Sequence, residues 1–460
     1  MRFRRHETTT HRNVSKRAND DQPVLRIVKG QDQAKEKTFR SGVMNKAREA
    51  VNLAGSARMI AGLTLALLGI GLYMVSSASI VPSLQVSGTT WHYFEYQLLY
   101  LVIGLFCGLV ASSLDYHRIL SPKIAAIGLG LALLSLMYVK INGVTISGSQ
   151  RWILIAGIQV QPSEVAKLAV AIAVSTSLAK ITADHRGDKP KVIAAALIAL
   201  PCAFFVVIEP DFGTASIIVA IGLASLYAVG VSGLTMVKSI AALGAAGLAY
   251  AMYNPYAVAR FSGLFHQGSD LLGKNYQLHQ SKIAVASGGL TGKGLGGSTL
   301  KYGALPNPHT DFIFSILGEE FGLFGTLVLI ALFGLFIWFG IRTAMRASDV
   351  PGTLIALTVT TWLGLQTIVN IASVVGLFPV TGVPLPFLSY GGTALIADLI
   401  AVGLLISVAK AEKPAQRSGT HAPKAKPRSG QRSVRNGRPT RQLATSGASR
   451  PAQGPSRRSR

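Results

Sequence analysis

Long apolar runs alternate with short polar segments over most of the chain. The runs lie at roughly 57–80, 96–114, 122–140, 164–179, 191–208, 214–230, 234–253, 312–341, 354–376 and 391–409. Most of them approach the length of about 20 residues that a helix needs to cross a bilayer. The pattern predicts an all-α polytopic membrane protein with about ten transmembrane helices.

The composition agrees with this pattern. The 460 residues are 49% hydrophobic and 14% charged, and the mean hydropathy is +0.41. These values exclude an ordinary soluble domain. Of the formal net charge of +25, about +7 falls in residues 1–56 and about +13 in residues 410–460. The membrane domain, 57–409, is therefore close to neutral, and the two tails are basic.

The tails predict attraction to anionic lipid headgroups. Nucleic acid is not expected as a partner, because neither tail contains interleaved aromatic residues or a folded module. The C-terminal tail is rich in Arg, Ser, Pro and Gly, so we expect it to be disordered. Cys107 and Cys202 lie inside apolar runs, which favours small buried side chains over a disulfide or a metal site.

The placement of Lys and Arg predicts the orientation in the membrane. With a cytoplasmic N-terminus, the cytoplasmic short loops hold most of the basic residues: Arg118, Lys123, Lys180, Arg186, Lys189, Lys191, Lys238, Arg342 and Arg346. The opposite short loops hold only Lys140 and Arg151. An even number of helices also returns the C-terminal tail to the cytoplasm. The polar loops are then extracytoplasmic, at 141–163, 209–213, about 254–311 (between helices 7 and 8) and 377–390.

Polar side chains gather in the first of these loops. Trp152 is an ordinary interfacial anchor, whereas Arg151 is unusual on a face poor in positive charge. The stretch 161–164 has the composition of a helix start, with Glu164 in the first turn. Glu164 and Lys167 are three residues apart and can pair on one helix face. An ion pair inside the bundle and a role in binding phosphate or sugar both remain open.

The large loop contains a Gly-rich segment with several lysines. It has a formal GxGxxG pattern over 292–297, but no βαβ unit surrounds it, so a nucleotide site is not expected. Exposed backbone N–H groups close to Lys282, Lys293 and Lys301 suit a pyrophosphate or sugar ligand. A flexible loop without a ligand is the alternative.

Acidic residues border the remaining loops. Asp311 lies where a polar loop meets a long apolar run. A carboxylate at the edge of a bilayer costs free energy, so we expect this one to have a functional role. Glu319 and Glu320 lie about two turns into the next helix and need partners. Asp211 either caps the following helix or acts in catalysis. The Pro- and Gly-rich stretch 382–393 predicts a re-entrant or broken segment buried in protein.

In this order and spacing, these clusters resemble the SEDS family (shape, elongation, division and sporulation proteins), over about 57–409. The resemblance implies a ten-helix peptidoglycan glycosyltransferase that works with a class B penicillin-binding protein, which supplies the transpeptidase. Such an enzyme polymerises lipid II into β-1,4-linked glycan and releases undecaprenyl pyrophosphate. The stretches 318–323 and 385–392, together with the long tails, resemble the division members more than the elongation members.

The resemblance also implies that Asp311 is the essential catalytic residue. A carboxylate can serve as the base that an acceptor hydroxyl needs, with inversion at C1 of the donor. The residues expected to bind substrate are Arg151, Trp152, Gln161, Glu164, Lys167, Gln280, Ser281, Lys282, Lys301, His309, Glu320 and Ser389. A divalent cation, Mg²⁺ or Mn²⁺, is an alternative to Lys and Arg as counter-charge for the pyrophosphate. Glu209 stands where the family usually has Gln, so the roles of Glu209 and Asp211 stay open.

Two other functions remain to be distinguished. A flippase for lipid II would also use many helices, broken segments and intramembrane charges, but it need not depend on Asp311. A non-catalytic scaffold would instead bind the penicillin-binding partner and recruit other division proteins through the tails. For each of these functions the expected location is the bacterial plasma membrane at the division septum.

Overall fold

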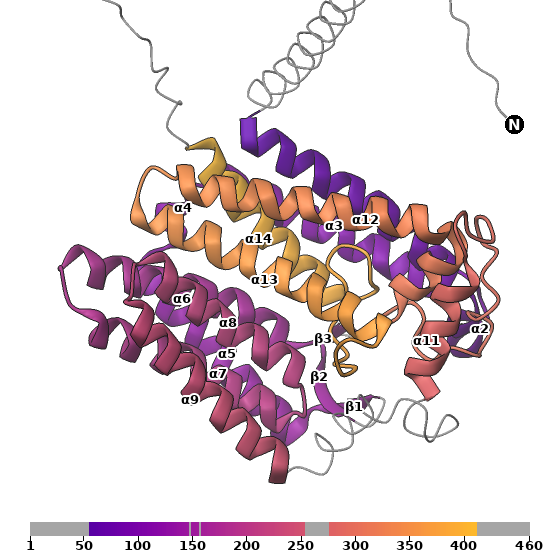
Figure 1. Ribbon diagram of the computed structural model, residues 1–460, viewed down its shortest axis with the longest axis horizontal. Helices are drawn as coiled ribbons and strands as arrows, with labels where there is room; N and C mark the ends of the chain where they lie inside the picture. The colour runs from indigo at the N-terminus through magenta and orange to yellow at the C-terminus, as the bar shows by residue number, and fades with distance from the viewer. Residues whose placement is uncertain (1–54, 147–148, 156–157, 254–275, 412–460) are drawn as a thin grey trace, which may run out of the picture. The chain divides into compact units, whose positions relative to one another are not determined.

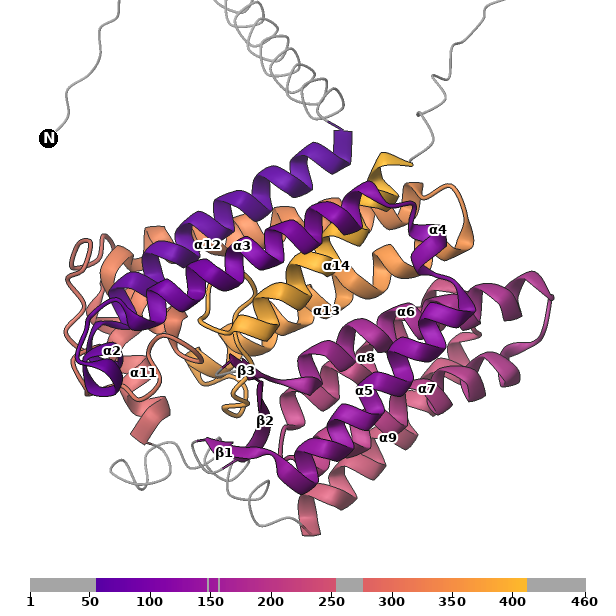
Figure 2. The same ribbon diagram turned by 180° about the vertical axis from the view of Figure 1, so that it is seen from behind.

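The computed structural model describes residues 55–146, 149–155, 158–253 and 276–411. The predictions for most of the two tails and for residues 254–275 of the large loop fall outside this range and stay predictions. Figures 1 and 2 show the described helices from opposite sides.

Helices account for most of the described residues. After the helix Gly55–Ala78 come α2 (Ile80–Ser87), α3 (His92–Ser113), α4 (Tyr116–Ile119), α5 (Pro122–Asn142), α6 (Pro162–Ala183), α7 (Asp188–Ile208), α8 (Phe212–Ala228), α9 (Gly233–Tyr253), α11 (Tyr276–Ser287), α12 (Ile313–Arg346), α13 (Val350–Val375) and α14 (Gly392–Lys410).

The predicted membrane spans are present as helices. Within the described ranges, 8 helices are long and apolar enough to cross a membrane, and α8 and α9 contribute shorter apolar helices at two further predicted positions. The fold class of a polytopic, mostly helical membrane protein is therefore confirmed. Cys107 and Cys202 are free cysteines, and Cys202 is buried as predicted whereas Cys107 is only partly buried.

The loop 141–163 contains short strands that were not predicted from the sequence. The strands β1 (Val144–Ile146), β2 (Ser149–Ile155) and β3 (Ile158–Val160) pair antiparallel in the order β1-β2-β3. Trp152 lies opposite Val144, and Ile153 lies opposite Val160. This short meander fixes Arg151 in an extended strand, where its side chain has a defined direction.

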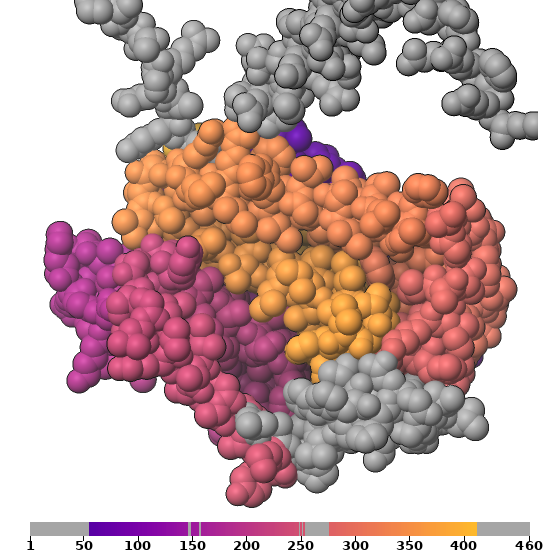
Figure 3. Space-filling model, in the orientation of Figure 1, coloured from indigo at the N-terminus to yellow at the C-terminus, as the bar shows by residue number. Residues whose placement is uncertain are grey.

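Two groups of helices can be followed in Figures 1 and 2. The helices α5 to α9 form one group, and Gly55–Ala78, α3, α12, α13 and α14 form the other. Helix α13 packs against α6 and α8 as well as α12, so it joins the groups. We call the end that carries α2, α11 and the strands the loop end. On the face shown in Figure 3, orange-yellow atoms from the end of α13 and the segment 377–391 reach the surface there.

Close helix packing in the second group depends on small residues. Gly104 and Gly108 of α3 lie against Leu399 of α14, and a β-carbon on Gly108 would stand 2.6 Å from the Leu399 carbonyl oxygen. Gly403 of α14 approaches the Gly108 carbonyl in the same way. Small residues let helix backbones approach closely where the surrounding lipid offers no hydrophobic driving force.

Candidate active site

Asp311 lies in the turn that leads into α12, and the backbone of this turn is fixed from several sides. The carbonyl of His309 accepts from the N–H of Tyr390 at 2.8 Å, and the carbonyl of Thr310 accepts from Ser389 Oγ at 2.6 Å. The carbonyl of Asp311 accepts from Asn370 Nδ2 at 3.0 Å. Consecutive carbonyls are therefore bound by α13 and the segment 377–391. Such bracing fixes the backbone from which the Asp311 side chain projects, as the support of a catalytic group requires.

Arg151 reaches the same region from β2. Its Nε donates to the Glu209 carbonyl at 3.0 Å, and its Nη2 donates to the Pro210 carbonyl at 2.5 Å. Its Nη1 lies 3.7 Å from Asp211 Oδ2. The side chain is only 6% exposed, so these contacts fix the guanidinium in a buried position rather than at a lipid interface.

The Arg151 and Asp311 side chains both approach Gly382. A β-carbon on Gly382 would stand 3.8 Å from both Arg151 Nη1 and Asp311 Oδ2. Gly382 has a φ of +74°, in the left-handed region that glycine adopts without steric cost. The glycine thus lets the segment 377–391 pass close to both charged groups. The arrangement brings a carboxylate and a guanidinium to the same glycine, which suits acid–base chemistry near an anion.

Asp211 is a helix cap, which is one of the two roles predicted from the sequence. Its carboxylate accepts from the N–H and the hydroxyl of Thr214 at the start of α8, at 3.1 and 3.0 Å. Glu209 is also buried, but neither carboxylate oxygen has a hydrogen-bond partner among the described residues. Burial, followed by the charge of Asp211, raises the pKa of Glu209 to about 8.

Glu164 and Lys167 form the predicted ion pair, with Lys167 Nζ 2.7 Å from Glu164 Oε2 and both side chains fully buried. Lys167 also donates to Gln366 Oε1 at 2.7 Å. Gln366 in turn donates to the Pro384 carbonyl at 3.0 Å. The pair is therefore linked through Gln366 to the segment 377–391. Nearby, the Gln161 N–H donates to Thr393 Oγ1, which ties the start of α6 to α14.

Lys301 and Glu320 form a second buried cluster, away from the Gly382 contact. Lys301 Nζ lies 2.9 Å from Glu320 Oε1 and also donates to Ser77 Oγ at 2.8 Å. Glu320 further accepts from Ser77 at 2.6 Å and from Tyr73 at 3.1 Å. Every charge in the cluster has a partner within the protein, so it has the character of a structural network.

The Gly-rich segment is folded onto α12, and its backbone N–H groups are not free for an anion. Lys293 N donates to the Glu319 carbonyl at 2.9 Å, and Gly294 N donates to the Glu320 carbonyl at 3.0 Å. In the opposite direction, the N–H of Leu323 in α12 donates to the Gly289 carbonyl at 2.9 Å. The expectation of exposed donors was wrong at these positions. The non-helical residue Gly322 interrupts α12 here, and the segment satisfies backbone groups that the interruption frees.

The other predicted site residues lie around α11 and β2. Ser281 Oγ contacts Ser315 Oγ at 2.8 Å and donates to the Val374 carbonyl at 2.7 Å, so it joins α11 to α12 and α13. Lys282 lies against Gly376. Gln280 and Trp152 are partly buried. The proposed role of these four residues in binding substrate stays a prediction.

The sequence analysis did not predict a role for the side-chain amides of Gln366 and Asn370. Both lie on α13, are nearly fully buried and bond to the segment 377–391 through the Pro384 and Val383 carbonyls. The available signal was their spacing of four residues inside an apolar run, which places two polar groups on one helix face. Polar residues in a membrane span usually face protein or a water-filled cavity.

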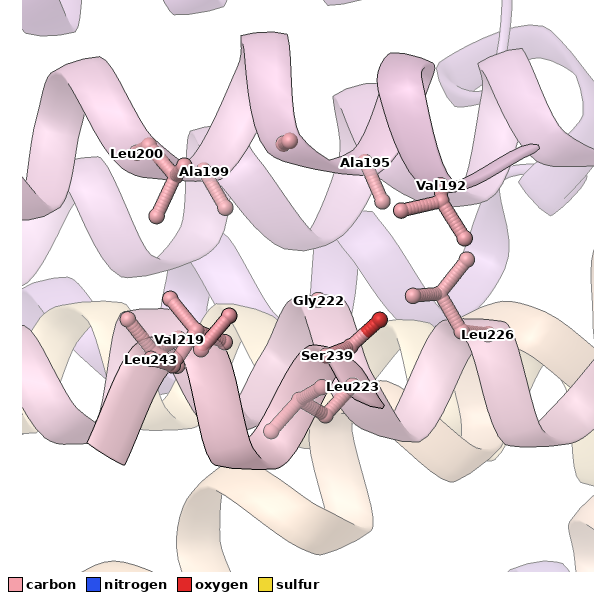
Figure 4. A pocket seen from close by; sticks show the side chains of 12 residues that line it. Val192, Ala195, Ala199, Leu200, Val219, Gly222, Leu223, Leu226, Ser239 and Leu243 are labelled. Atoms are coloured by element: carbon pink, nitrogen blue, oxygen red, sulfur yellow. The ribbon is translucent and has the colours of Figure 1, made fainter. Parts of the chain in front are cut away.

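A cavity of about 220 Å³ lies between α7, α8 and α9, away from these polar clusters (Figure 4). Its walls are almost entirely apolar, with Val192, Val219, Leu223 and Leu243 among them. It offers no group for acid–base chemistry. Within the described ranges, no three His, Cys, Asp or Glu side chains come together as a metal site.

Comparisons with known proteins agree on one family. The FtsW/RodA/SpoVE family model, described as a cell cycle protein, matches residues 58–414. A probable peptidoglycan glycosyltransferase FtsW of Thioalkalivibrio sulfidiphilus (strain HL-EbGR7) is 37% identical over 361 residues, which cover 76% of this chain and 89% of that protein. Stage V sporulation protein E of Bacillus subtilis (strain 168) is 35% identical over 356 residues, covering 76% and 95%.

Solved structures show the same fold. A chain from a peptidoglycan synthase complex, described as coordinating polymerization and crosslinking, matches with a TM-score of 0.62 and 25% identity over 76% of this chain and 96% of that one. The rod shape determining protein RodA of Thermus thermophilus matches with a TM-score of 0.56 and 25% identity, over 76% and 95% of the two chains.

Proposed function

The chain belongs to the FtsW/RodA/SpoVE family of cell cycle proteins, and on this basis we propose that it polymerises lipid II with Asp311 as the catalytic base. It is a peptidoglycan glycosyltransferase, similar to relatives that carry the name FtsW. The observation that carries the assignment of Asp311 is the braced turn before α12, where its carboxylate and the Arg151 guanidinium both approach Gly382.

In the proposed reaction, Asp311 accepts the proton of the 4-hydroxyl of an acceptor sugar. The hydroxyl oxygen then attacks C1 of the lipid-linked donor, and the bond from C1 to the pyrophosphate oxygen breaks with inversion. Inversion requires one base and no covalent intermediate on the protein. Undecaprenyl pyrophosphate leaves with the electron pair of the broken bond.

Arg151 is the cation best placed to stabilise the leaving pyrophosphate. Lys167 and Lys301 are fully buried, and each is paired with a glutamate. Arg151 Nη1 also pairs with a carboxylate, Asp211 Oδ2 at 3.7 Å, but it lies 3.8 Å from the β-carbon position of Gly382, as Asp311 Oδ2 does. Preorganised charge near a developing anion is usually a large contribution to catalysis. A divalent cation bound together with substrate would supply similar stabilisation.

The partner and the location of the protein are inferred from its relatives. The similarity to a chain from a peptidoglycan synthase complex supports a class B penicillin-binding protein as partner and lipid II as substrate. The apolar helices and the family support a multi-pass protein of the bacterial plasma membrane. We further propose that the loop end faces outward at the septum and that both tails are cytoplasmic, where they bind other division proteins.

The deciding experiment compares wild type with Asp311→Asn in lipid II polymerisation by the purified full chain and its class B partner. Asp184→Asn is the matched control, because Asp184 is an exposed acid that pairs with Arg186. We expect glycan product from the wild type and the control and none from Asp311→Asn, with unchanged partner binding.

Full polymerisation by Asp311→Asn would remove Asp311 from this role and turn attention to Glu209 and Asp211. If no variant polymerises while lipid II still crosses the membrane, transport replaces polymerisation as the proposed function.

A further inference from the structure

Aromatic rings surround the residue two positions before Asp311. The ring of Tyr93, on α3, lies 4.5 Å from that of His309 and 4.8 Å from that of Tyr390, measured between centroids. The His309 and Tyr390 rings are 5.7 Å apart. Tyr93 and Tyr390 are partly exposed, whereas His309 is only 7% exposed. The three rings thus form a cluster with an accessible aromatic surface and a buried imidazole.

Two buried polar atoms in this cluster lack a partner. His309 Nδ1 has no hydrogen bond with any described residue. Gln97, one turn along α3 from Tyr93, donates through Nε2 to the Ser389 carbonyl at 3.3 Å, but its Oε1 has no described partner. Buried polar groups are nearly always hydrogen-bonded, so these two atoms indicate a missing ligand.

The cluster is uncharged at neutral pH. Burial lowers the pKa of His309 to about 4, so its imidazole is neutral at pH 7. No lysine or arginine belongs to the cluster, and Arg151 lies on the Gly382 side of Asp311. An uncharged group with both polar and apolar surfaces fits this environment better than a pyrophosphate does.

We propose that Tyr93, His309 and Tyr390 form a saccharide subsite that holds a hexopyranose ring of the acceptor glycan beside Asp311. The C–H groups on a pyranose face pack on the aromatic rings, while hydroxyl or acetamido groups bond to His309 Nδ1 and Gln97 Oε1. The acceptor fits better than the donor, because the reacting end of the donor carries a pyrophosphate. This inference rests on the proposed glycosyl transfer.

An interfacial aromatic belt is the simpler explanation for tyrosines near the end of a membrane helix. A belt accounts for the partly exposed rings of Tyr93 and Tyr390. It does not account for a nine-tenths buried histidine, or for unpartnered polar atoms on His309 and Gln97.

The first test measures polymerisation kinetics with the full chain and its partner in nanodiscs. Tyr93→Leu removes the ring and Tyr93→Phe keeps it, while Tyr227→Leu, at an exposed position on α8, is the matched control. We expect Tyr93→Leu to raise KM about tenfold with kcat little changed, and Tyr93→Phe to restore the wild-type KM. A structural role would instead lower the melting temperature and leave KM unchanged.

The second test measures binding of a soluble β-1,4-linked trimer of N-acetylglucosamine to the same preparation. His309→Phe keeps an aromatic ring but removes both ring nitrogens, and we expect it to weaken trimer binding about tenfold. Tyr93→Leu should weaken binding similarly, while Asp311→Asn should bind the trimer as the wild type does.

The outcomes separate this inference from the proposed function. If the wild type polymerises, Asp311→Asn does not, and Tyr93→Leu and His309→Phe match the wild type in KM and trimer binding, the subsite is overturned and the glycosyltransferase assignment stands. If the wild type does not polymerise at all, the proposed function fails first. A wild-type protein that polymerises but does not bind the trimer also overturns the subsite.

Discussion

The guanidinium of Arg151 and the carboxylate of Asp311 approach the same point of the backbone, because Arg151 Nη1 and Asp311 Oδ2 would each lie 3.8 Å from a β-carbon on Gly382. The remaining guanidinium donors are already used by the carbonyls of Glu209 and Pro210. The third nitrogen, Nη1, lies 3.7 Å from Asp211 Oδ2. The turn between α7 and α8 therefore holds the guanidinium close to Gly382, in the region where we place the chemistry.

This geometry predicts that Arg151→Lys lowers the rate of polymerisation. Lysine keeps the charge but cannot donate to both carbonyls while also holding a nitrogen beside Asp311. Loss of charge-assisted hydrogen bonds of about 1.5–3 kcal/mol predicts a rate lower by about tenfold to a hundredfold. Arg186→Lys, at an exposed pair with Asp184, is the matched control. A wild-type rate for Arg151→Lys would show that its forked geometry is unimportant.

The sequence predicted the spans and the polar clusters, because long apolar runs and isolated charges are strong local signals. It also predicted that Glu164 and Lys167 pair, since a spacing of three fixes their helix face. It could not predict that Arg151 and Asp311 both approach Gly382, because these residues belong to segments far apart in the chain. The aromatic cluster around His309 was not predicted for the same reason, since Tyr93 belongs to α3 and Tyr390 to the segment 377–391.

The Gly-rich segment was misread because glycines suggest flexibility unless their neighbours are known. A β-carbon on Gly292 would stand 2.1 Å from the Glu320 carbonyl oxygen, whereas one on Gly294 would meet nothing within 4 Å. Both residues have positive φ, +80° and +91°. The first glycine is required for close approach to the interrupted helix α12, and the second only for its backbone conformation.

The two glycines give a matched pair of substitutions. Gly294→Ala should cost only the strain of positive φ, about 1 kcal/mol. Gly292→Ala should cost about 3 kcal/mol, because the backbone of α12 must also move. The melting temperature of the purified protein in detergent measures the difference. Equal melting temperatures for the two variants would contradict the docking of this segment on α12.

Glu209 predicts a pH dependence of stability. Its pKa rises from 4.5 to about 8 on folding, chiefly through burial, so the folded protein retains a proton that the unfolded chain releases. Stability should therefore fall as pH rises from about 5 to 8. Glu209→Gln removes the titrating group and keeps the shape of the side chain. We expect the variant to melt higher than the wild type at pH 8, with the two converging near pH 5.

Asp184→Asn is the control for this series, because Asp184 is an exposed acid whose loss should not change the slope against pH. If stability changes with pH in the same way for Glu209→Gln and the wild type, Glu209 is ionised in the folded protein and bonded to a partner there. In that case, the glutamate that stands in place of the family's usual glutamine adds a permanent negative charge next to Arg151. The rate of lipid II polymerisation by Glu209→Gln should then differ from the wild-type rate at every pH.

The pair of Lys301 and Glu320 separates a structural role from substrate binding. Lys301→Met leaves the carboxylate of Glu320 buried with only Ser77 and Tyr73 as donors. Breaking a buried pair in this way costs about 3–5 kcal/mol, so the variant should melt well below the wild type. The double variant Lys301→Met/Glu320→Gln removes both charges and should recover most of the stability.

The activity of the double variant then decides between the two roles. If Lys301 and Glu320 only hold the Gly-rich segment against α12, the double variant should polymerise lipid II at close to the wild-type rate once it is stable. If either side chain binds substrate, activity should stay low although the melting temperature recovers. Their complete pairing within the protein, with Lys301 only 1% exposed, favours the first result. Recovery of stability without recovery of polymerisation would assign the pair to the substrate instead.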